Sequence, residues 1–310
     1  MTVDGRQRLL ADLALALIAF IWGATFIVVK RALADVSPTL FLAIRFALGA
    51  LLLAVVFRGR WIPPRGLRWW TVQRCALLGA CLIAGYILQT IGLDRTTASK
   101  AGFITGFYIP LVPFLLMFVI RGRRLEVVRP KPVEAVGISI ATIGVILMTL
   151  PDERMSVSRG DLLVLASTAA WALQIILLGR WTGKIPFETV TVIQIAAAAV
   201  FATLAFPFVD LPARFTGTGP VVFAILVCAV IATAVAFSLQ SWAQQHTTPT
   251  RTALIFALEP VFAWLTAYFV AGERLTARAS FGGFAILAGI VLVELKPSLF
   301  RGHPLDRVES

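Results

Sequence analysis

Two ionisable side chains stand inside long apolar stretches of the sequence. Arg45 lies within residues 39–57, and Glu259 lies within residues 252–271. An unpaired charge in such surroundings is unfavourable, so a residue of this kind is a functional candidate by default. Glu259 suits three roles: a proton carrier, a partner for a cationic group on a substrate, or a structural partner of Arg45 or of the backbone. The sequence leaves all three open.

Two prolines stand near the middle of apolar stretches, Pro110 in the first half of the chain and Pro260 in the second. A proline inside a helix frees the carbonyl four residues earlier and bends the helix. The freed carbonyls are those of Gly106 and Phe256. Helices interrupted at matching places in two halves of a chain point to a binding site in a carrier. A packing kink without substrate contact is the alternative.

Aromatic and amide side chains recur on the faces of other apolar stretches. Trp22 and Trp171 fall near mid-depth, away from the membrane interface where tryptophan usually anchors a helix. Together with neighbouring polar residues they predict a mostly apolar pocket with a few hydrogen-bonding groups, as is usual in small-molecule sites. Core packing is the alternative for any one of them. The candidates for the substrate pathway are Trp22, Thr25, Arg45, Tyr86, Gln89, Tyr108, Trp171, Gln174, Gln240 and Glu259.

The stretches that carry these residues are long enough to cross a membrane. Of 310 residues, 59% are hydrophobic and 14% charged, and the mean hydropathy is +0.88. Crossing the hydrocarbon core takes roughly 20 apolar residues in a helix. The stretches of about this length are residues 9–29, 39–57, 75–93, 99–120, 132–150, 162–178, 190–209, 221–242, 252–271 and 279–295. They predict an all-α integral membrane protein of ten transmembrane helices.

The charged and sulfur-containing residues exclude several other classes of protein. The net charge of +12 comes from Lys and Arg in the gaps between stretches, which argues against nucleic-acid binding. Cys75, Cys81 and Cys228 lack the spacing of a metal site, and His246 and His303 stand far apart. The sequence has no GxxxxGK[ST] loop, so we expect no nucleotide hydrolysis. We expect neither a metal nor another cofactor.

The basic residues also predict an orientation. Counted over alternate gaps, Lys and Arg show a roughly two-to-one excess on the side of the N-terminus, which places both termini in the cytoplasm. The first stretch follows Arg6 and Arg8, but it is too long for the apolar region of a signal peptide and lacks a cleavage site. We therefore expect it to be kept as the first span.

The chain resembles itself at a spacing of about 150 residues. Each half then holds five spans, and because five is odd, the second half enters the membrane from the opposite side. Such an inverted repeat places a binding site near the midplane, and exchange between the conformations of its halves provides alternating access. The matched positions include Asp12 and Asp161, Trp22 and Trp171, Tyr86 and Phe237, Gln89 and Gln240, Lys100 and Arg251, and Pro110 and Pro260.

Several motifs resemble the EamA domains of the drug/metabolite transporter superfamily. They are Trp22-Gly23-Ala24-Thr25-Phe26 with Lys30, Arg45-Phe46, the run 99–106, and Leu258-Glu259-Pro260 followed by Gly272-Glu273-Arg274-Leu275. The resemblance covers nearly the whole chain as two EamA repeats, residues 9–150 and 160–296. It implies a ten-helix inner-membrane carrier with cytoplasmic termini and a central cavity lined mainly by spans 1, 3, 4, 6, 8 and 9. Members of the family move amino acids, other metabolites or drugs, commonly outward.

The sequence thus predicts a secondary transporter of a bacterial-type cytoplasmic membrane, and not an enzyme. Export of amino acids or related small metabolites is the first hypothesis. A multidrug exporter and a metabolite uptake permease are alternatives within transport. A polytopic membrane enzyme is less favoured because the sequence offers no nucleophile–base or metal-ligand set. We expect a small-molecule substrate and membrane lipid as partners, and a monomer or weak homodimer.

Overall fold

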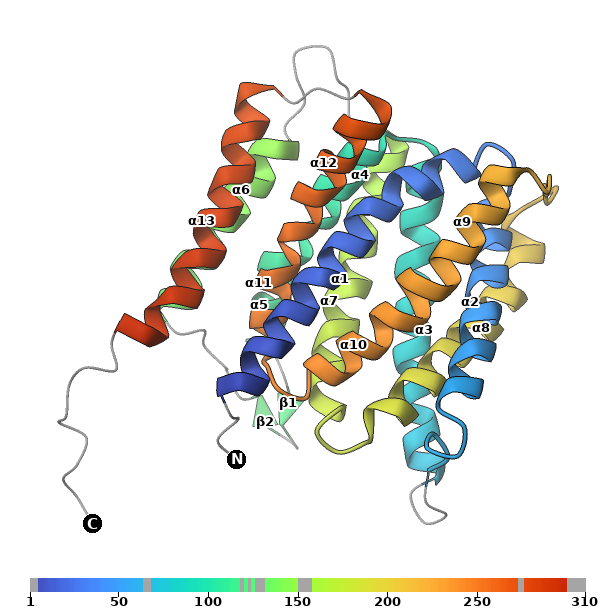
Figure 1. Cartoon of the computed structure of the whole chain (residues 1–310), viewed down its shortest axis with the longest axis horizontal. Coiled ribbons are helices and arrows are strands. Elements are labelled where there is room, and N and C mark those ends of the chain that lie inside the picture. The colour runs from blue at the N-terminus through green and yellow to red at the C-terminus, as the bar shows by residue number, and fades with distance from the viewer. Residues whose placement is uncertain are drawn as a thin grey trace.

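The computed structural model describes residues 5–63, 68–117, 120–121, 124–125, 132–149, 158–272 and 276–299. It is a bundle of long helices (Figure 1). Leu150, at the end of the first predicted repeat, and Glu273, Arg274 and Leu275 of the second motif lie outside the described residues. The helices are α1 (Gly5–Ala32), α2 (Pro38–Val56), α3 (Arg68–Asp94), α4 (Ala98–Thr105), α5 (Tyr108–Leu116), α6 (Pro132–Thr149), α7 (Arg159–Trp181), α8 (Phe187–Val209), α9 (Gly219–Ala229), the π-helix η2 (Val230–Val235), α10 (Ala236–Ala243), α11 (Pro249–Phe256), α12 (Leu258–Ala271) and α13 (Ala277–Leu299).

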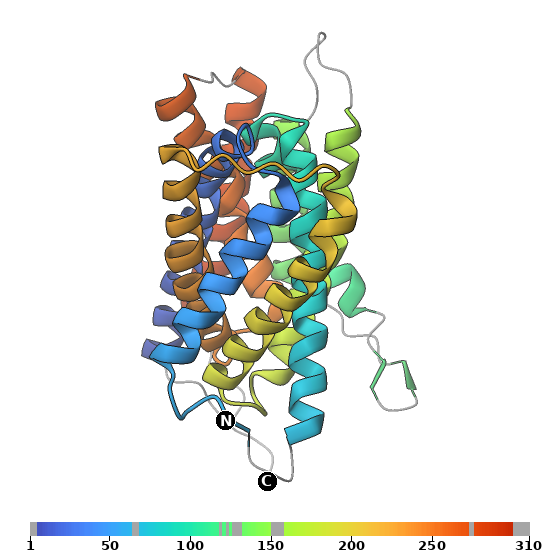
Figure 2. The ribbon, with the colours of Figure 1, turned by 90° about the vertical axis from the view of Figure 1, so that its right-hand side faces the viewer.

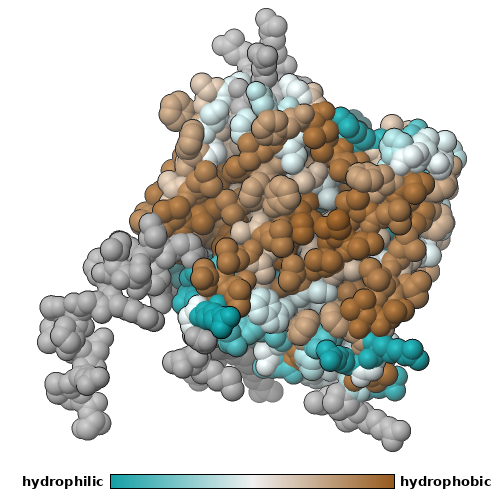
Figure 3. All heavy atoms as spheres, viewed as in Figure 1, coloured by the Kyte–Doolittle hydropathy of each residue, from teal (hydrophilic) through white to brown (hydrophobic). Residues whose placement is uncertain are grey.

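The helices have the length and surface of membrane spans. Eight helical segments of the described chain are long and apolar enough to cross a membrane, and two shorter apolar helices cover Pro132–Met148 and Ala277–Val293. Large apolar side chains face outward, among them Phe208 at 81% exposure and Phe269 at 79%. On the face seen in Figure 3, apolar residues form a broad band between two more hydrophilic ends. The fold is therefore that of an all-α, multi-pass membrane protein.

Two spans are each broken into two helices. The fourth apolar stretch forms α4 and α5, separated at Gly106, and the ninth forms α11 and α12, separated at Ala257. Pro110 and Pro260 each occupy the third position of the second helix. A proline in a first helical turn costs little, because amide hydrogens there lack helical partners anyway. The chain direction of the two spans is opposite, since α4 lies above α5 whereas α11 lies below α12 (Figure 1).

A small hairpin corrects one predicted boundary. The stretch expected to run to Ile120 ends as a helix at Leu116. Ile120 instead belongs to strand β1 (Ile120–Arg121), which pairs antiparallel with β2 (Arg124–Leu125). The hairpin stands outside the helical bundle (Figure 2). Arg121 and Arg124 therefore lie in the strands of this hairpin and not in a helix.

Small residues allow the closest helix contacts. Helices α6 and α13 lie side by side (Figure 1) and cross at glycines. A Cβ atom added at Gly144 would lie 2.5 Å from the carbonyl oxygen of Gly282, and one added at Gly282 would lie 2.6 Å from that of Gly144. Such distances leave no room for a side chain. The remaining helices pack through one large apolar core that surrounds the cavity described next.

Candidate functional site

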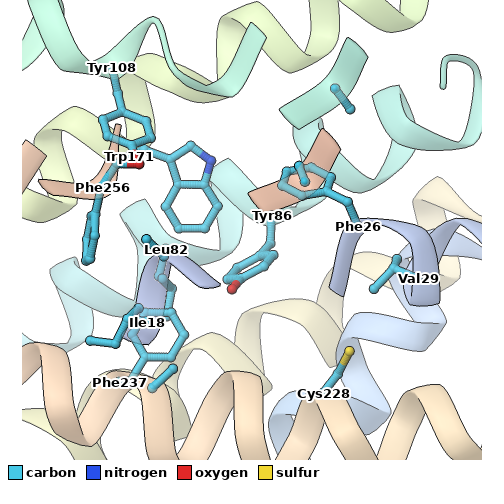
Figure 4. Packing of buried hydrophobic residues seen from close by; sticks show 14 of the residues in the cluster. Ile18, Phe26, Val29, Leu82, Tyr86, Tyr108, Trp171, Cys228, Phe237 and Phe256 are labelled. Carbon is cyan, nitrogen blue, oxygen red and sulfur yellow. The ribbon is translucent and has the colours of Figure 1, made fainter. Parts of the chain in front are cut away.

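One cavity in the bundle is lined by all ten residues predicted for the substrate pathway. The rest of its lining comes from two threonines and from apolar residues of the core, several of which are drawn in Figure 4. The space inside it that the centre of a water-sized sphere can occupy is about 50 Å³. Its lining residues are Trp22, Thr25, Phe26, Val29, Arg45, Tyr86, Gln89, Thr90, Leu93, Thr105, Tyr108, Trp171, Gln174, Ile175, Gln240, Phe256 and Glu259.

Arg45 is held by the π-helix and by Tyr86. Its Nε donates to the hydroxyl of Thr233 at 2.8 Å, and its Nη2 donates to the hydroxyl of Tyr86 at 3.1 Å and to the carbonyl of Ala232 at 3.3 Å. The guanidinium carbon also lies 4.6 Å from the centre of the Tyr86 ring, within reach of a cation–π contact. These contacts fix a charged group that is only 3% exposed.

The Ala232 carbonyl accepts a second hydrogen bond, from the indole nitrogen of Trp22 at 3.0 Å. A π-helix leaves carbonyls outside the regular helical ladder, and such turns are frequent at functional sites. The Ala232 carbonyl thereby links α1 and α2 to the span that contains the π-helix. Arg45 adds the second span to the six that were expected to line the cavity.

Glu259 has a different partner from the one considered in the sequence. Its Oε2 lies 3.1 Å from the hydroxyl of Tyr108, and the carboxylate is 5% exposed. Within the described residues no ion pair joins Glu259 to Arg45. The cavity lining therefore contains a cationic group bound by several protein groups and a carboxyl group whose hydrogen-bond partner is Tyr108.

The hydroxyl of Tyr108 also lies 3.1 Å from the carbonyl oxygen of Phe256. This carbonyl is the group that Pro260 leaves without its helical donor. A hydroxyl has one hydrogen and can donate to only one acceptor at a time. A protonated Glu259 can donate to the Tyr108 oxygen while Tyr108 serves Phe256, whereas a carboxylate competes with the carbonyl for the same hydrogen.

Amide side chains form a buried chain of hydrogen bonds that joins α7, α8 and α10. Gln240 donates to Gln174 at 3.2 Å, Gln174 donates to Gln194 at 3.5 Å, and Gln194 donates to Ser241 at 3.3 Å. Two buried polar atoms of the lining have no hydrogen-bond partner in the described part of the chain: the indole nitrogen of Trp171 and Oε1 of Gln240. They offer a bound molecule one donor and one acceptor.

Aromatic rings form the apolar walls. Trp171 packs edge-on against Tyr86 with ring centres 4.6 Å apart, and Trp22 packs against Phe237 at 5.3 Å and against Phe256 at 5.1 Å. Figure 4 shows Trp171, Tyr86 and Phe256 converging from different helices. The repeat matches Trp22 with Trp171 and Tyr86 with Phe237. Each tryptophan therefore contacts one member of the matched aromatic pair, and each contact joins the two halves of the chain.

Some lining residues were not predicted, although a pattern was present for several. Phe26 and Val29 stand four and seven positions after Trp22, on one helical face. Thr105 stands three before Tyr108 and accepts a hydrogen bond from Gln89 at 3.0 Å. Thr233 does not line the cavity but holds Arg45, and the sequence gave no signal for it because it reaches Arg45 from the π-helix.

Metal binding has no support in the part of the chain that the structure describes. No group of three or more His, Cys, Asp or Glu residues there is placed to hold a metal ion. The cavity offers instead one cation, one carboxylate, amides, hydroxyls and aromatic rings. Such a lining can bind and release a small amphipathic molecule.

Comparisons with known proteins agree along almost the whole chain. The model of the EamA-like transporter family matches residues 9–150 and again residues 158–295. A protein of Archaeoglobus fulgidus named "Uncharacterized transporter" is 32% identical over 94% of this chain and 88% of its own. The "Uncharacterized inner membrane transporter YedA" of Escherichia coli K12 is 26% identical over 97% and 95%. A solved crystal structure shares the fold, with a TM-score of 0.71 at 16% identity over 94% of this chain and 98% of that one.

Proposed function

This chain belongs to the EamA-like transporter family, and from that premise we propose that it exports amino acids or related small metabolites by alternating access. It is a multi-pass membrane transporter and not an enzyme. The observation that carries the substrate proposal is the make-up of the cavity, in which Arg45 and Glu259 line one aromatic-walled space.

The charges of the cavity favour a substrate without net charge. One Arg and one Glu line it, so the wall is balanced when both are ionised. A zwitterion brings an ammonium group for the carboxylate of Glu259 and a carboxylate for hydrogen-bond donors of the lining. The indole nitrogen of Trp171 is such a donor, and it has no partner among the described residues. The aromatic rings then suit an apolar side chain on the substrate.

Contacts between the halves support the inverted-repeat architecture that we propose. Trp171 contacts Tyr86, and their matched residues Trp22 and Phe237 also contact each other. Both broken spans place their breaks beside this cavity, and they run in opposite directions (Figure 1). Ten spans with both termini in the cytoplasm, in a bacterial-type cytoplasmic membrane, are part of the same proposal.

A multidrug exporter is the second candidate, because aromatic rings and few fixed polar groups also suit bulky apolar cations. The two candidates differ in what Glu259 should do. For a zwitterionic substrate, a substrate carboxylate is required together with the ammonium group. For a cationic drug, the ammonium group alone is enough.

Proteoliposomes test the proposal directly. Purified protein is assayed with a labelled amino-acid panel, with and without a pH gradient, and in competition with amines that lack the carboxylate. We expect saturable transport of apolar amino acids that amines compete for poorly. Trp22→Ala should impair transport, while Trp69→Ala, at a side chain that is 73% exposed, serves as the matched control. Competition by amines alone would favour the multidrug exporter, and chemical alteration of a lipid or sugar without transport would contradict both.

A further inference from the structure

Two ion pairs lie away from the cavity and join the two halves of the chain. Arg251 forms a two-pronged contact with Asp12, with Nε to Oδ1 at 3.0 Å and Nη2 to Oδ2 at 2.6 Å. Lys100 lies 2.6 Å from Oδ2 of Asp161. All four side chains are between 5% and 14% exposed. Pairs so well covered are screened less than ordinary surface pairs.

The two pairs are matched to each other by the sequence repeat. Asp12 corresponds to Asp161, and Arg251 corresponds to Lys100, at the same spacing of about 150 residues. In one pair the first half provides the acid and the second half the base; in the other pair the roles are reversed. Thr97 and Thr248, also matched, cap the helices that present the two bases, by accepting from the amides of Lys100 and Arg251.

The two pairs lie at opposite ends of the bundle. Lys100 is the third residue of α4, which begins at the upper end in Figure 1, and Asp161 is the third residue of α7. Arg251 is the third residue of α11, which begins at the lower end, where α1 also begins. The cavity lies between the two ends, where α4 meets α5 and α11 meets α12.

We propose that Asp12–Arg251 and Lys100–Asp161 are the two gates of the transport cycle, each closing one end of the cavity and opening while the other is closed. This inference rests on the alternating access of the proposed function. Each gate crosses between the halves, so a movement that separates the halves at one end must break the pair there. Because the two pairs are equivalent in the repeat, each end of the cavity is closed by one acidic and one basic side chain.

The two gates differ in their surroundings. Asp161 also accepts from the hydroxyl of Thr96 at 2.7 Å and from the amide of Ser158 at 2.7 Å. Asp12 is paired with Arg251. Thr96 belongs to the first half of the chain, so opening the Lys100–Asp161 gate also breaks the contact of Asp161 with Thr96 and leaves its contact with Ser158. The hydroxyl of Thr96 thus adds a second contact between the halves at this gate.

Labelling of one cysteine from each side of the membrane tests the gates without any substrate. Cys75, Cys81 and Cys228 are replaced by alanine, and Thr25→Cys provides a reporter in the cavity. An impermeant maleimide is added to one face at a time. Lys100→Gln should raise labelling from the face at that end about fivefold and lower it from the other, as expected for loss of an ion pair of this size. Asp12→Asn should do the opposite.

Matched variants separate gating from general damage. Arg95→Ala and Arg8→Ala remove exposed cations at the same two ends and should leave both labelling rates unchanged. The exchanged pair Asp12→Arg with Arg251→Asp should restore the original rates, and Lys100→Arg should keep them. A variant that does not fold is replaced by one that neutralises the other member of its pair, Arg251→Gln for Asp12→Asn and Asp161→Asn for Lys100→Gln.

The outcomes distinguish this inference from the proposed function. Equal labelling from both faces in Lys100→Gln and Asp12→Asn, with folded protein and intact transport, would overturn the gates and leave the carrier. A face-dependent change in labelling with no amino-acid transport would keep the gates and remove the proposed substrate class. Labelling that rises equally from both faces would show a leak, which also contradicts alternating gates.

Discussion

The hydroxyl of Tyr108 lies 3.1 Å from the carbonyl oxygen of Phe256 and supplies the hydrogen that Pro260 lacks. The same hydroxyl is 3.1 Å from Oε2 of Glu259. One hydrogen thus serves two acceptors, one of which changes charge with its proton. Loss of that proton draws the hydroxyl from the broken helix towards the carboxylate. The contact links the ionisation of Glu259 to the shape of the span that carries it.

Tyr108→Phe removes this link while keeping the ring. We expect the maximal rate of transport to fall about tenfold, because the unpaired Phe256 carbonyl costs on the order of 1–3 kcal/mol and the helix break shifts to satisfy it. Initial rates in proteoliposomes measure the effect. Tyr268→Phe, at a residue that is 43% exposed, is the control and should retain the parental rate.

Glu259→Gln imitates a carboxyl group that never loses its proton, since the amide can donate to the Tyr108 oxygen. If Glu259 carries a proton, this variant should still exchange labelled for unlabelled substrate but should not accumulate substrate against its gradient when a pH gradient is applied. Counterflow and pH-driven transport, measured in the same vesicles, separate these activities. Retained pH-driven accumulation in the variant would exclude the proton-carrier role.

Trp171→Phe tests the unpartnered indole nitrogen in the cavity. A lost hydrogen bond to the substrate should raise KM about fivefold, since one such bond contributes about 1 kcal/mol. Trp264→Phe is a close control, because its indole nitrogen is also buried without a partner in the described chain but does not line the cavity. A similar change of KM in both variants would argue against a substrate contact at Trp171.

Adjacent glycines in α13 should respond oppositely to alanine. At Gly282 a Cβ would lie 2.6 Å from the Gly144 carbonyl oxygen, whereas at Gly283 it would meet no atom of the described residues within 4 Å. Gly282→Ala should lower the free energy of unfolding by about 2 kcal/mol through overpacking. Gly283→Ala should raise it by up to about 1 kcal/mol through helix propensity. Unfolding in detergent, followed by circular dichroism, measures both.

The sequence predicted an all-α, multi-pass membrane protein and its family, because both depend on local patterns. Apolar stretches longer than about 17 residues have few other uses, and the Leu258-Glu259-Pro260 motif lies within one span. The resemblance between the two halves was visible because residues at matched positions are of similar chemical type. Even the two helix breaks had a local signal, since Pro110 and Pro260 occur at matching positions.

The partners of the buried charges were not predictable from the same patterns. Arg45 contacts Thr233 and Ala232 through a π-helix, which changes the helical register by tertiary packing and leaves no distinctive residue type in Val230–Val235. The pairing of Glu259 with Tyr108 depends on two broken helices meeting. Such contacts join residues far apart in the chain, and periodicity within one span does not report them.

The π-helix divides its span into two regular helices, α9 before it and α10 after it. Each residue of an α-helix turns the chain by about 100°, so deletion of one residue from α9 would rotate everything that follows by that angle. Gln240 and Phe237 would then face away from their present neighbours. Such a deletion would turn Gln240 out of the cavity wall, whereas a deletion within the π-helix can be absorbed by a return to α-helical hydrogen bonding.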